Sequence, residues 1–306
     1  MTVTLSQRVQ EYLRLRRALG FRLQREGQVL PQFAAYLEQA GAATVTAGHA
    51  IAWAQLPQGV DPVNWTHRLT AVRSFAAWLR TIDPATEIPP RGVFPGQGKR
   101  PVPFIYSGSD ITALISACGS LRPRTRAATY TALFGLIAVT GIRIGEAFAL
   151  DAADLDAAAQ VLAVTGKYGR TRLIALHPTT AAALTGYLQI RAARAADGTS
   201  ALLIGQAGRR LSRNMACAVF RSLAAGCGLA PQPGCGSPRL HDFRHTVAVS
   251  TLTDALRHGR DVDACIAVLA THLGHVSPAH TYWYYSDSRV IPILAPLRVW
   301  RSCGLG

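Results

Sequence analysis

Before residue 84, the apolar side chains recur at the spacing of an α-helix, about 3.6 residues. Thr46 is a capping residue at the start of a helix that reaches Trp53, and Asp61 followed by Pro62 is an N-cap with proline at the first helical position. We therefore expect four short helices that form an all-α domain over residues 1–83. The apolar stripes that would face its core are Leu5, Val9, Tyr12 and Leu13; Val29, Leu30, Phe33, Tyr36 and Leu37; and Trp65, Leu69, Val72, Ala76 and Leu79.

A segment rich in proline and glycine follows, over residues 84–104. It holds six of the 17 prolines of the chain, together with Gly92, Gly96 and Gly98, so neither a helix nor a central strand can persist there. We expect an extended linker between two domains. Its Lys99 and Arg100 suit a strap along a phosphate backbone, although a linker with no binding role has the same composition.

Residues 105–306 begin with further helical periods. Ser109 is expected to cap a first helix. The apolar run Ala127–Val139 predicts a second helix that ends at Thr140 and Gly141, so that Arg143 lies at the start of the next one. More helices are expected over residues 179–195, 213–225, 241–257 and 262–273.

A short β-hairpin interrupts these helices. Two runs of β-branched and aliphatic residues, Gln160–Val164 and Arg172–Leu176, flank a glycine-containing turn that has Lys167 at its tip. The fold class predicted from the whole pattern is mainly α. A helical N-terminal domain precedes a C-terminal α+β domain with a small sheet, over residues 105–306.

The chain is strongly basic. It has 32 Lys and Arg against 17 Asp and Glu, a formal net charge of +15. The excess is present in both halves, with 12 basic and 6 acidic residues up to position 100 and 20 and 11 after it. A positive field over two folded halves favours a polyanion such as nucleic acid as the partner. A generally Arg-rich composition gives the same excess, because only two of the basic residues are Lys.

Composition also excludes several classes. With 49% hydrophobic and 16% charged residues, the chain is an ordinary globular protein and not a disordered one. Its six cysteines include no CxxC pair and no spacing typical of zinc, which indicates reduced thiols. No window approaches about eighteen uninterrupted apolar residues. We expect a cytoplasmic, nucleoid-associated protein of bacterial type, neither secreted nor membrane-spanning.

Two arginine motifs carry candidate chemistry. Arg143 in TGIRIGEAFAL lies one helical turn before Glu146, and a local ion pair is the simple interpretation. In HDFRHT, His241 and Arg244 are three residues apart and share one helical face. His241 and His245 would also suit zinc, but no HExxH glutamate accompanies them and the adjacent arginine would repel a cation.

The segment THLGHVSPAHTYWYYS is the last cluster, with three histidines and three tyrosines. A core aromatic stripe is the usual meaning of such a run. Here the run follows a Leu-Gly-His turn and a Ser-Pro start, which places the tyrosines near the beginning of a helix.

These segments resemble, in order, four motifs of the tyrosine recombinases, or phage integrase family. TGIRIGE resembles the first-arginine motif, GKYGRTRLIAL the lysine hairpin, HDFRHT the HxxR box, and LGHVSPAHTYWYYS the second histidine with the nucleophilic tyrosine. The resemblance implies a site-specific recombinase that cleaves and rejoins DNA. It also implies a helical, SAM-like core-binding domain before the catalytic domain.

The resemblance further assigns the site. Glu146 would orient the first arginine, and Tyr282 and Tyr285 compete with Tyr284, which follows His275 by the usual nine residues. The implied catalytic residues are Arg143, Lys167, His241, Arg244, His275 and Tyr284.

These residue types suit attack by a tyrosine on a phosphodiester. Arg143 and Arg244 offer fixed bidentate donors to the non-bridging oxygens. Arginine is a poor proton donor, so protonation of the 5′ oxygen falls to Lys167, one of only two lysines in the chain.

The two histidines have lesser roles in this scheme. His241 would assist proton transfer from Tyr284 or brace the phosphate, and His275 would hydrogen-bond a phosphate oxygen. Because a 3′-phosphotyrosine conserves the energy of the broken bond, we expect no metal, ATP or other cofactor.

The implied partner is double-stranded DNA with specific recombination sites, bound by a homotetramer. The apolar tail, residues 289–306, would pack on a neighbouring protomer or on its own domain. The residues expected to contact DNA are Arg68, Arg73, Lys99, Arg100, Arg170 and Arg172.

Two alternatives share this fold. A type IB topoisomerase resembles the same catalytic set but relaxes DNA as a monomer, and the separate helical half and the tail favour recombination instead. A catalytically inactive DNA-binding or architectural protein is the second alternative, and the intact set of catalytic residue types argues against it.

Overall fold

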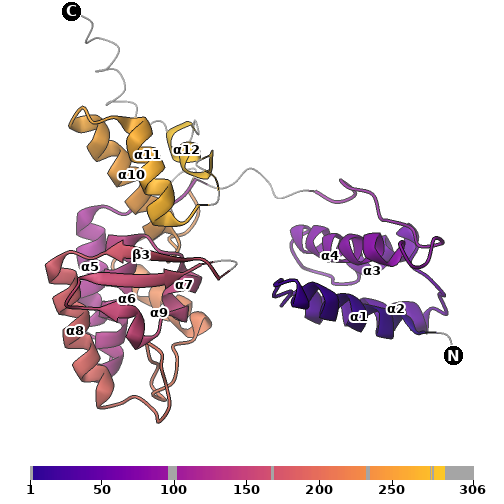
Figure 1. Ribbon diagram of the computed structural model, residues 1–306, viewed down its shortest axis with the longest axis horizontal. Helices are drawn as coiled ribbons and strands as arrows, with labels where there is room; N and C mark the ends of the chain where they lie inside the picture. The colour runs from indigo at the N-terminus through magenta and orange to yellow at the C-terminus, as the bar shows by residue number, and fades with distance from the viewer. Residues whose placement is uncertain are drawn as a thin grey trace, which may run out of the picture. The chain divides into compact units, whose positions relative to one another are not determined.

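The chain divides into two units, Met1–Arg100 and Pro101–Gly306 (Figure 1). Each unit has its own hydrophobic core. The computed structural model describes residues 3–95, 102–166, 169–231, 235–275, 277 and 279–286, and at positions 283, 285 and 286 it describes the backbone alone.

Four helices build the first unit: α1 (Leu5–Ala18), α2 (Glu26–Gln39), α3 (Ala47–Gln55) and α4 (Val63–Leu79). The Thr46 side chain accepts a hydrogen bond from the backbone of His49 and so caps α3. Asp61 accepts one from the Val63 N–H, at the start of α4. The apolar stripes face the core as expected, and Phe33, Trp53 and Phe75 are fully buried there. The four-helix prediction is confirmed.

The part of the Pro-rich segment up to residue 95 lies along α4. It contains no helix or strand up to residue 95. Arg73 donates from Nε and Nη2 to the carbonyls of Pro89 and Pro90, at 2.8 and 2.6 Å. Thr66 Oγ1 donates to the carbonyl of Pro95, at 2.8 Å. These contacts attach residues 89–95 to the first unit.

The second unit is mainly helical. The helix that follows the linker is capped by Ser107, and the prediction of Ser109 as the cap is wrong. Ser107 Oγ accepts from the backbone of Asp110, whose carboxylate accepts in return from the Ser107 N–H. The helices are α5 (Gly108–Cys118), α6 (Arg124–Thr140), α7 (Ile144–Ala149), the 3-10 turn η1 (Ala152–Asp154), α8 (Pro178–Ala192), α9 (Arg213–Gly226), α10 (Asp242–Arg257), α11 (Val262–Leu273) and α12 (Ala279–Ser286).

A small antiparallel sheet lies in this unit, with strand order β1-β2-β3. The predicted hairpin is β2 (Val161–Thr165) and β3 (Thr171–Ala175), and a two-residue strand, β1 (Leu155–Asp156), adds an edge that the sequence pattern did not predict. Leu162 pairs with Ile174, and both are buried. The hairpin tip, Lys167 and Tyr168, lies outside the described residues.

Helix α10 joins two clusters of buried side chains. Phe243 packs with Phe134 and Phe220 in the larger cluster, whereas Leu252 packs with residues of α11 and with Tyr284 in a smaller one. Helices α10, α11 and α12 gather at one end of the unit (Figure 1). The architecture is mainly α with one small sheet, as expected. Within the described part of the chain, no helix is long and apolar enough to cross a membrane.

Candidate active site

Arg143 lies between two helices, where the chain turns sharply. Helix α6 ends at Gly141, whose φ of +60° is a left-handed conformation, and Arg143 is the N-cap of α7. The Nη1 of Arg143 donates to Oε1 of Glu146 at 2.9 Å, and its backbone N–H donates to Oε2. The expected Arg143–Glu146 ion pair is therefore present. The Arg143 side chain keeps 28% of its surface exposed.

Three consecutive carbonyls at the end of α11 each accept from a different arginine. His272 O accepts from Nε of Arg172 at 2.8 Å, Leu273 O from Nη2 of Arg244 at 2.7 Å, and Gly274 O from Nη2 of Arg143 at 2.8 Å. The last carbonyls of a helix have no intrahelical donor and carry the negative end of its dipole. The C-terminus of α11 therefore gathers the three guanidiniums, and we call residues 272–274 the carbonyl turn.

Gly274 makes this arrangement possible. Its φ is +65°, and a Cβ at this position would lie 2.9 Å from Nη1 of Arg172 and 3.3 Å from Nη1 of Arg143. A larger residue would be strained in this conformation and would displace the arginines.

Arg244, on α10, is the most enclosed of the three arginines, with 3% of its surface exposed. Its Nη1 donates to Gly141 O at 2.9 Å, so it connects the end of α6 to the carbonyl turn. Burial, and next the positive charge of Arg143, lower the pKa of Arg244 to about 10, while Tyr284 and Glu146 act in the opposite direction. Arg244 therefore stays protonated at neutral pH.

Glu146 is shared by two arginines. Its Oε2 accepts from Nη2 of Arg172 at 2.7 Å, in addition to the bonds from Arg143. Burial alone would raise the pKa of Glu146, but the hydrogen bonds from Arg172 and Arg143 outweigh burial and lower it. The carboxylate is therefore ionised at neutral pH and fixed on both sides.

Three histidines lie close in sequence to Arg244 or to the carbonyl turn. His241 is the N-cap of α10, and its ring meets that of His245 edge-on at 5.0 Å between centroids. His275 Nδ1 lies 2.7 Å from Oγ1 of Thr281. His272 donates from Nε2 to Thr140 O at 2.7 Å, a structural link between the ends of α6 and α11. In the described residues no group of three or more His, Cys, Asp or Glu side chains is placed to hold a metal ion.

Tyr284 is buried, with 3% of its surface exposed, and a hydrogen bond of 2.8 Å joins its hydroxyl to Nδ1 of His245. Tyr282 is 40% exposed, and its hydroxyl donates to Asp263 at 2.9 Å. This hydrogen bond raises the pKa of Tyr282, which disfavours its phenolate. Tyr284 is thus the buried and Tyr282 the exposed one of these two tyrosines, and the side chain of Tyr285 lies outside the described residues.

The sequence analysis did not predict that Arg172 binds Glu146 and the carbonyl turn, or that His245 binds Tyr284. We expected Arg172 at the DNA and considered His245 only as a zinc ligand. The sequence did hold a signal for Arg172. Arg172 lies two residues before the buried Ile174 on the same strand, so both side chains are on the inward face of that strand. No local pattern indicated the contact of His245 with Tyr284.

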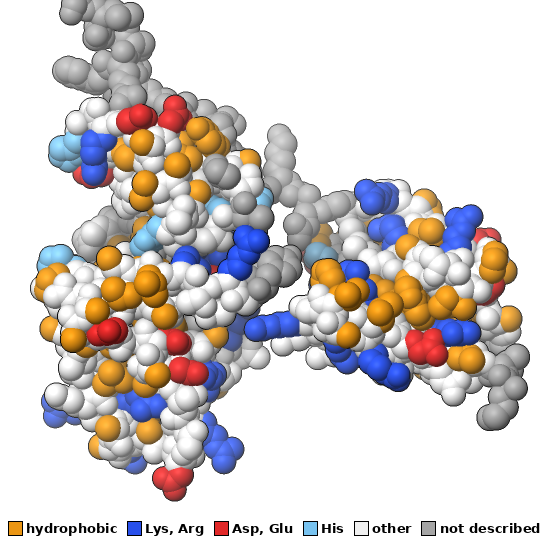
Figure 2. Space-filling view, in the orientation of Figure 1, with side chains coloured by type: hydrophobic (Ala, Val, Ile, Leu, Met, Phe, Trp, Pro, Cys, Tyr) orange, Lys and Arg blue, Asp and Glu red, His pale blue; other side chains and the backbone are white. Residues whose placement is uncertain are grey.

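The six arginines and lysines expected at the DNA fall into three groups. Arg170 is exposed, and Lys99 and Arg100 lie outside the described residues, as does the catalytic candidate Lys167. The other three arginines have partners within the protein. Arg68 stacks on the Trp53 ring at 3.7 Å and donates to the Trp53 carbonyl. Arg73 donates to the carbonyls of Pro89 and Pro90, and Arg172 to Glu146 and His272 O. Arginine side chains are spread over the visible face of both units (Figure 2).

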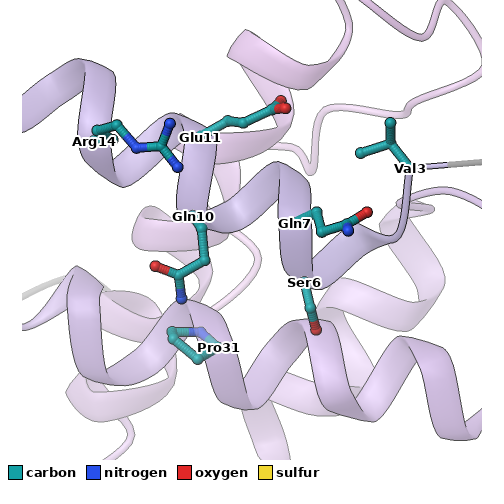
Figure 3. Close-up of a pocket in the computed structure, with 7 residues that line it drawn as sticks. All are labelled: Val3, Ser6, Gln7, Gln10, Glu11, Arg14 and Pro31. Carbon is teal, nitrogen blue, oxygen red and sulfur yellow. The ribbon is translucent and has the colours of Figure 1, made fainter.

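A groove lies between α1 and α2 of the first unit, with a volume of about 460 Å³ (Figure 3). None of the expected catalytic or DNA-contacting residues lines it. It is lined by Val3, Ser6, Gln7, Gln10, Glu11, Arg14 and Pro31.

Two curated proteins are similar to this chain over much of its length. The integrase/recombinase named y4rB of Sinorhizobium fredii is 40% identical over 293 residues, which are 93% of each chain. Tyrosine recombinase XerD of Mycobacterium tuberculosis is 32% identical over 228 residues, 72% of this chain and 66% of the relative.

A solved structure has the same fold. The Tn1549 transposon integrase, solved in complex with a circular intermediate DNA, superposes with a TM-score of 0.67 over 98% of this chain and 100% of the other, at 17% identity. Residues 106–289 match the phage integrase family, and they span the arginine cluster, the hairpin and Tyr284. The chain therefore belongs to the phage integrase family of tyrosine recombinases.

Proposed function

We propose that this protein is a site-specific DNA recombinase that cleaves and rejoins DNA through a 3′-phosphotyrosine. The observation that carries the proposal is the convergence of Arg143 and Arg244 on adjacent carbonyls of the carbonyl turn. Tyr284 lies close enough to Arg244 to affect its pKa. Two fixed guanidiniums beside a tyrosine suit a phosphodiester whose charge grows during attack.

In the proposed step, the Tyr284 oxygen forms a bond to phosphorus as the bond from phosphorus to the 5′ oxygen breaks. Arg143 and Arg244 hydrogen-bond the non-bridging oxygens, and His275 donates a further hydrogen bond. Lys167 donates the proton that the 5′ oxygen needs, and His241 accepts the proton that the tyrosine loses. Reversal of the step with a new 5′ hydroxyl rejoins the strand, so neither a metal nor ATP takes part.

The buried position of Tyr284 adds one requirement. Its hydroxyl is bonded to His245, and a duplex cannot reach a side chain that is 3% exposed. Attack on DNA therefore requires α12 to move and this hydrogen bond to be exchanged. We infer that the movement accompanies assembly on the recombination site as a homotetramer, with the tail beyond Tyr284 packed on a neighbour.

The proposal is tested by trapping the intermediate. Nicked duplexes tiled across the DNA on both sides of the gene would be incubated with the protein in EDTA without ATP. We expect an adduct that survives SDS and disappears with protease, formed by wild type and by Tyr282→Phe but not by Tyr284→Phe. Cleavage that requires magnesium, or no adduct on any duplex, would contradict the proposal. Relaxation of a supercoiled plasmid that lacks the cleaved site would indicate topoisomerase activity instead.

A further inference from the structure

Arg172 makes three hydrogen bonds to two partners within the second unit. Its Nη1 and Nη2 donate to the two oxygens of Glu146 at 3.3 and 2.7 Å, and its Nε donates to His272 O at 2.8 Å. Its side chain is 15% exposed. A guanidinium with these partners gains little from a further contact to solvent or DNA.

The contacts of the Glu146 carboxylate, which binds both Arg172 and Arg143, indicate how Arg172 affects Arg143. Glu146 has about four acceptor sites, and four hydrogen bonds reach it, two from each arginine. Because Arg172 occupies one side, Arg143 gives Glu146 only one guanidinium N–H and gives another to Gly274 O. Without Arg172, the carboxylate would draw Arg143 into a bidentate pair and away from a phosphate.

Arg172 also connects the lysine hairpin to this cluster. It lies on β3, and Gly166, the last described residue before Lys167, is at the base of the tip. A Cβ at Gly166 would lie 3.3 Å from Oε1 of Glu146 and 3.6 Å from Nη1 of Arg172. The hairpin base, the carboxylate and the carbonyl turn therefore meet at one guanidinium.

We propose that Arg172 is a positioning residue for strand cleavage, an inference that rests on the proposed function. Through Glu146 and His272 O it fixes the angle at which Arg143 faces the phosphate, and it keeps the base of the hairpin, at Gly166, beside Glu146. It acts through these neighbours and does not touch the DNA.

The test compares Arg172→Met and Arg172→Lys with wild type on a nicked duplex that yields the covalent adduct. A small displacement of a catalytic group costs about 100-fold in rate, and we expect a single-turnover loss of that order for Arg172→Met with unchanged DNA affinity. Lysine keeps the charge opposite Glu146 but cannot bridge to His272 O, so Arg172→Lys should recover thermal stability and not the cleavage rate.

Arg210→Met is the matched control. Arg210 donates to the carbonyls of Phe148 and Leu150 at 2.9 Å and pairs with Asp151, so its loss breaks contacts of the same kind at the C-terminal end of α7 and none of the hydrogen bonds of Arg143 or Glu146. This variant should cleave at the wild-type rate. Equal rate losses in Arg210→Met and Arg172→Met would overturn the inference, because they would indicate a general effect on stability.

A double-mutant cycle with Glu146→Gln decides whether Arg172 acts through Glu146. We expect the double variant to cleave no more slowly than the slower single variant. It removes both charges of the pair and should fold even if Arg172→Met does not. Additive losses, or a salt dependence of DNA binding reduced by about one phosphate contact, would instead assign Arg172 to the DNA. An adduct formed equally by wild type and Arg172→Met overturns only this inference, whereas no wild-type adduct removes the proposed function as well.

Discussion

The hydroxyl of Tyr284 and Nδ1 of His245 are 2.8 Å apart, in a pair whose side chains are each 3% exposed. The proposed nucleophile is thus held inside the small core of α10, α11 and α12. Its partner His245 directly follows, on α10, the arginine that would bind the phosphate. The release of the tyrosine is a separate event from the chemistry.

From the hydrogen bond between Tyr284 and His245 we predict how readily each tyrosine is nitrated when no DNA is bound. We expect tetranitromethane to nitrate the exposed Tyr282 before Tyr284. His245→Ala should increase nitration of Tyr284 and lower stability by about 1–3 kcal/mol, because a buried hydroxyl loses its partner. His258→Ala, at the exposed end of the same helix, is the control. Tandem mass spectrometry of the peptide that contains both tyrosines gives the two rates, and equal rates in wild type would contradict the buried pair.

Glu146 predicts a pH dependence of stability. Its pKa is lowered in the folded state from an ordinary 4.5, so its contribution is fully present above that pH and is lost as the pH falls through the lowered value. Glu146→Gln should cost about 3 kcal/mol at pH 7, where two arginines lose their counter-ion, and less in acid.

Urea unfolding of the second unit's helices at pH 7 and pH 3 measures this difference. Asp254→Asn, which breaks an exposed ion pair with Arg260, should cost less than about 1 kcal/mol at pH 7. If Glu146→Gln lowered the free energy of unfolding equally at pH 7 and pH 3, the stabilising effect of Glu146 would not come from its charge.

Gly274 and Gly259 provide a matched pair of substitutions. Both have left-handed backbones, with φ of +65° and +62°, but a Cβ at Gly259 would meet nothing within 4 Å. Alanine at either site should cost about 1–2 kcal/mol of stability from backbone strain. Only Gly274→Ala should also slow cleavage, because its methyl group would displace Arg172 and Arg143. Equal cleavage rates in the two variants would contradict the role of the carbonyl turn.

The helices were predictable because their signals are local. The apolar stripes, the Thr46 cap and the glycine at the end of α6 each lie within a few residues of what they specify. The correct cap, Ser107 in place of Ser109, also has a local signal, because Asp110 lies three residues after Ser107 and completes a capping box. Strand β1 has only two residues, too few for an alternation to be recognised.

The arrangement of the candidate site was only partly predictable. The Arg143–Glu146 pair follows from a spacing of three residues. Arg143 and Gly274 are 131 residues apart, and Arg172 and His272 are 100 apart. Such contacts arise from the packing of α6, β3 and α11, which no local pattern specifies. Motif resemblance predicted Arg143 and Arg244 as site residues, and the fold was needed to find that three consecutive carbonyls accept hydrogen bonds from three arginines.

Lys167 is predicted to be the general acid. Lys167→Arg keeps the charge but not a readily donated proton, so cleavage of ordinary DNA should fall strongly. A substrate with sulfur at the 5′ bridging position has a leaving group that scarcely needs protonation, and it should restore much of the rate. Equal impairment on both substrates would make Lys167 a phosphate contact and His241 the next candidate.

The most direct test of the central claim is the location of the covalent bond. The adduct trapped on a nicked duplex would be digested with nuclease and trypsin, which releases residues 261–289 with all three candidate tyrosines on one peptide. Tandem mass spectrometry should place the remaining nucleotide on Tyr284 through a phosphate. A nucleotide on Tyr282, on Tyr285 or on any other residue would contradict the account.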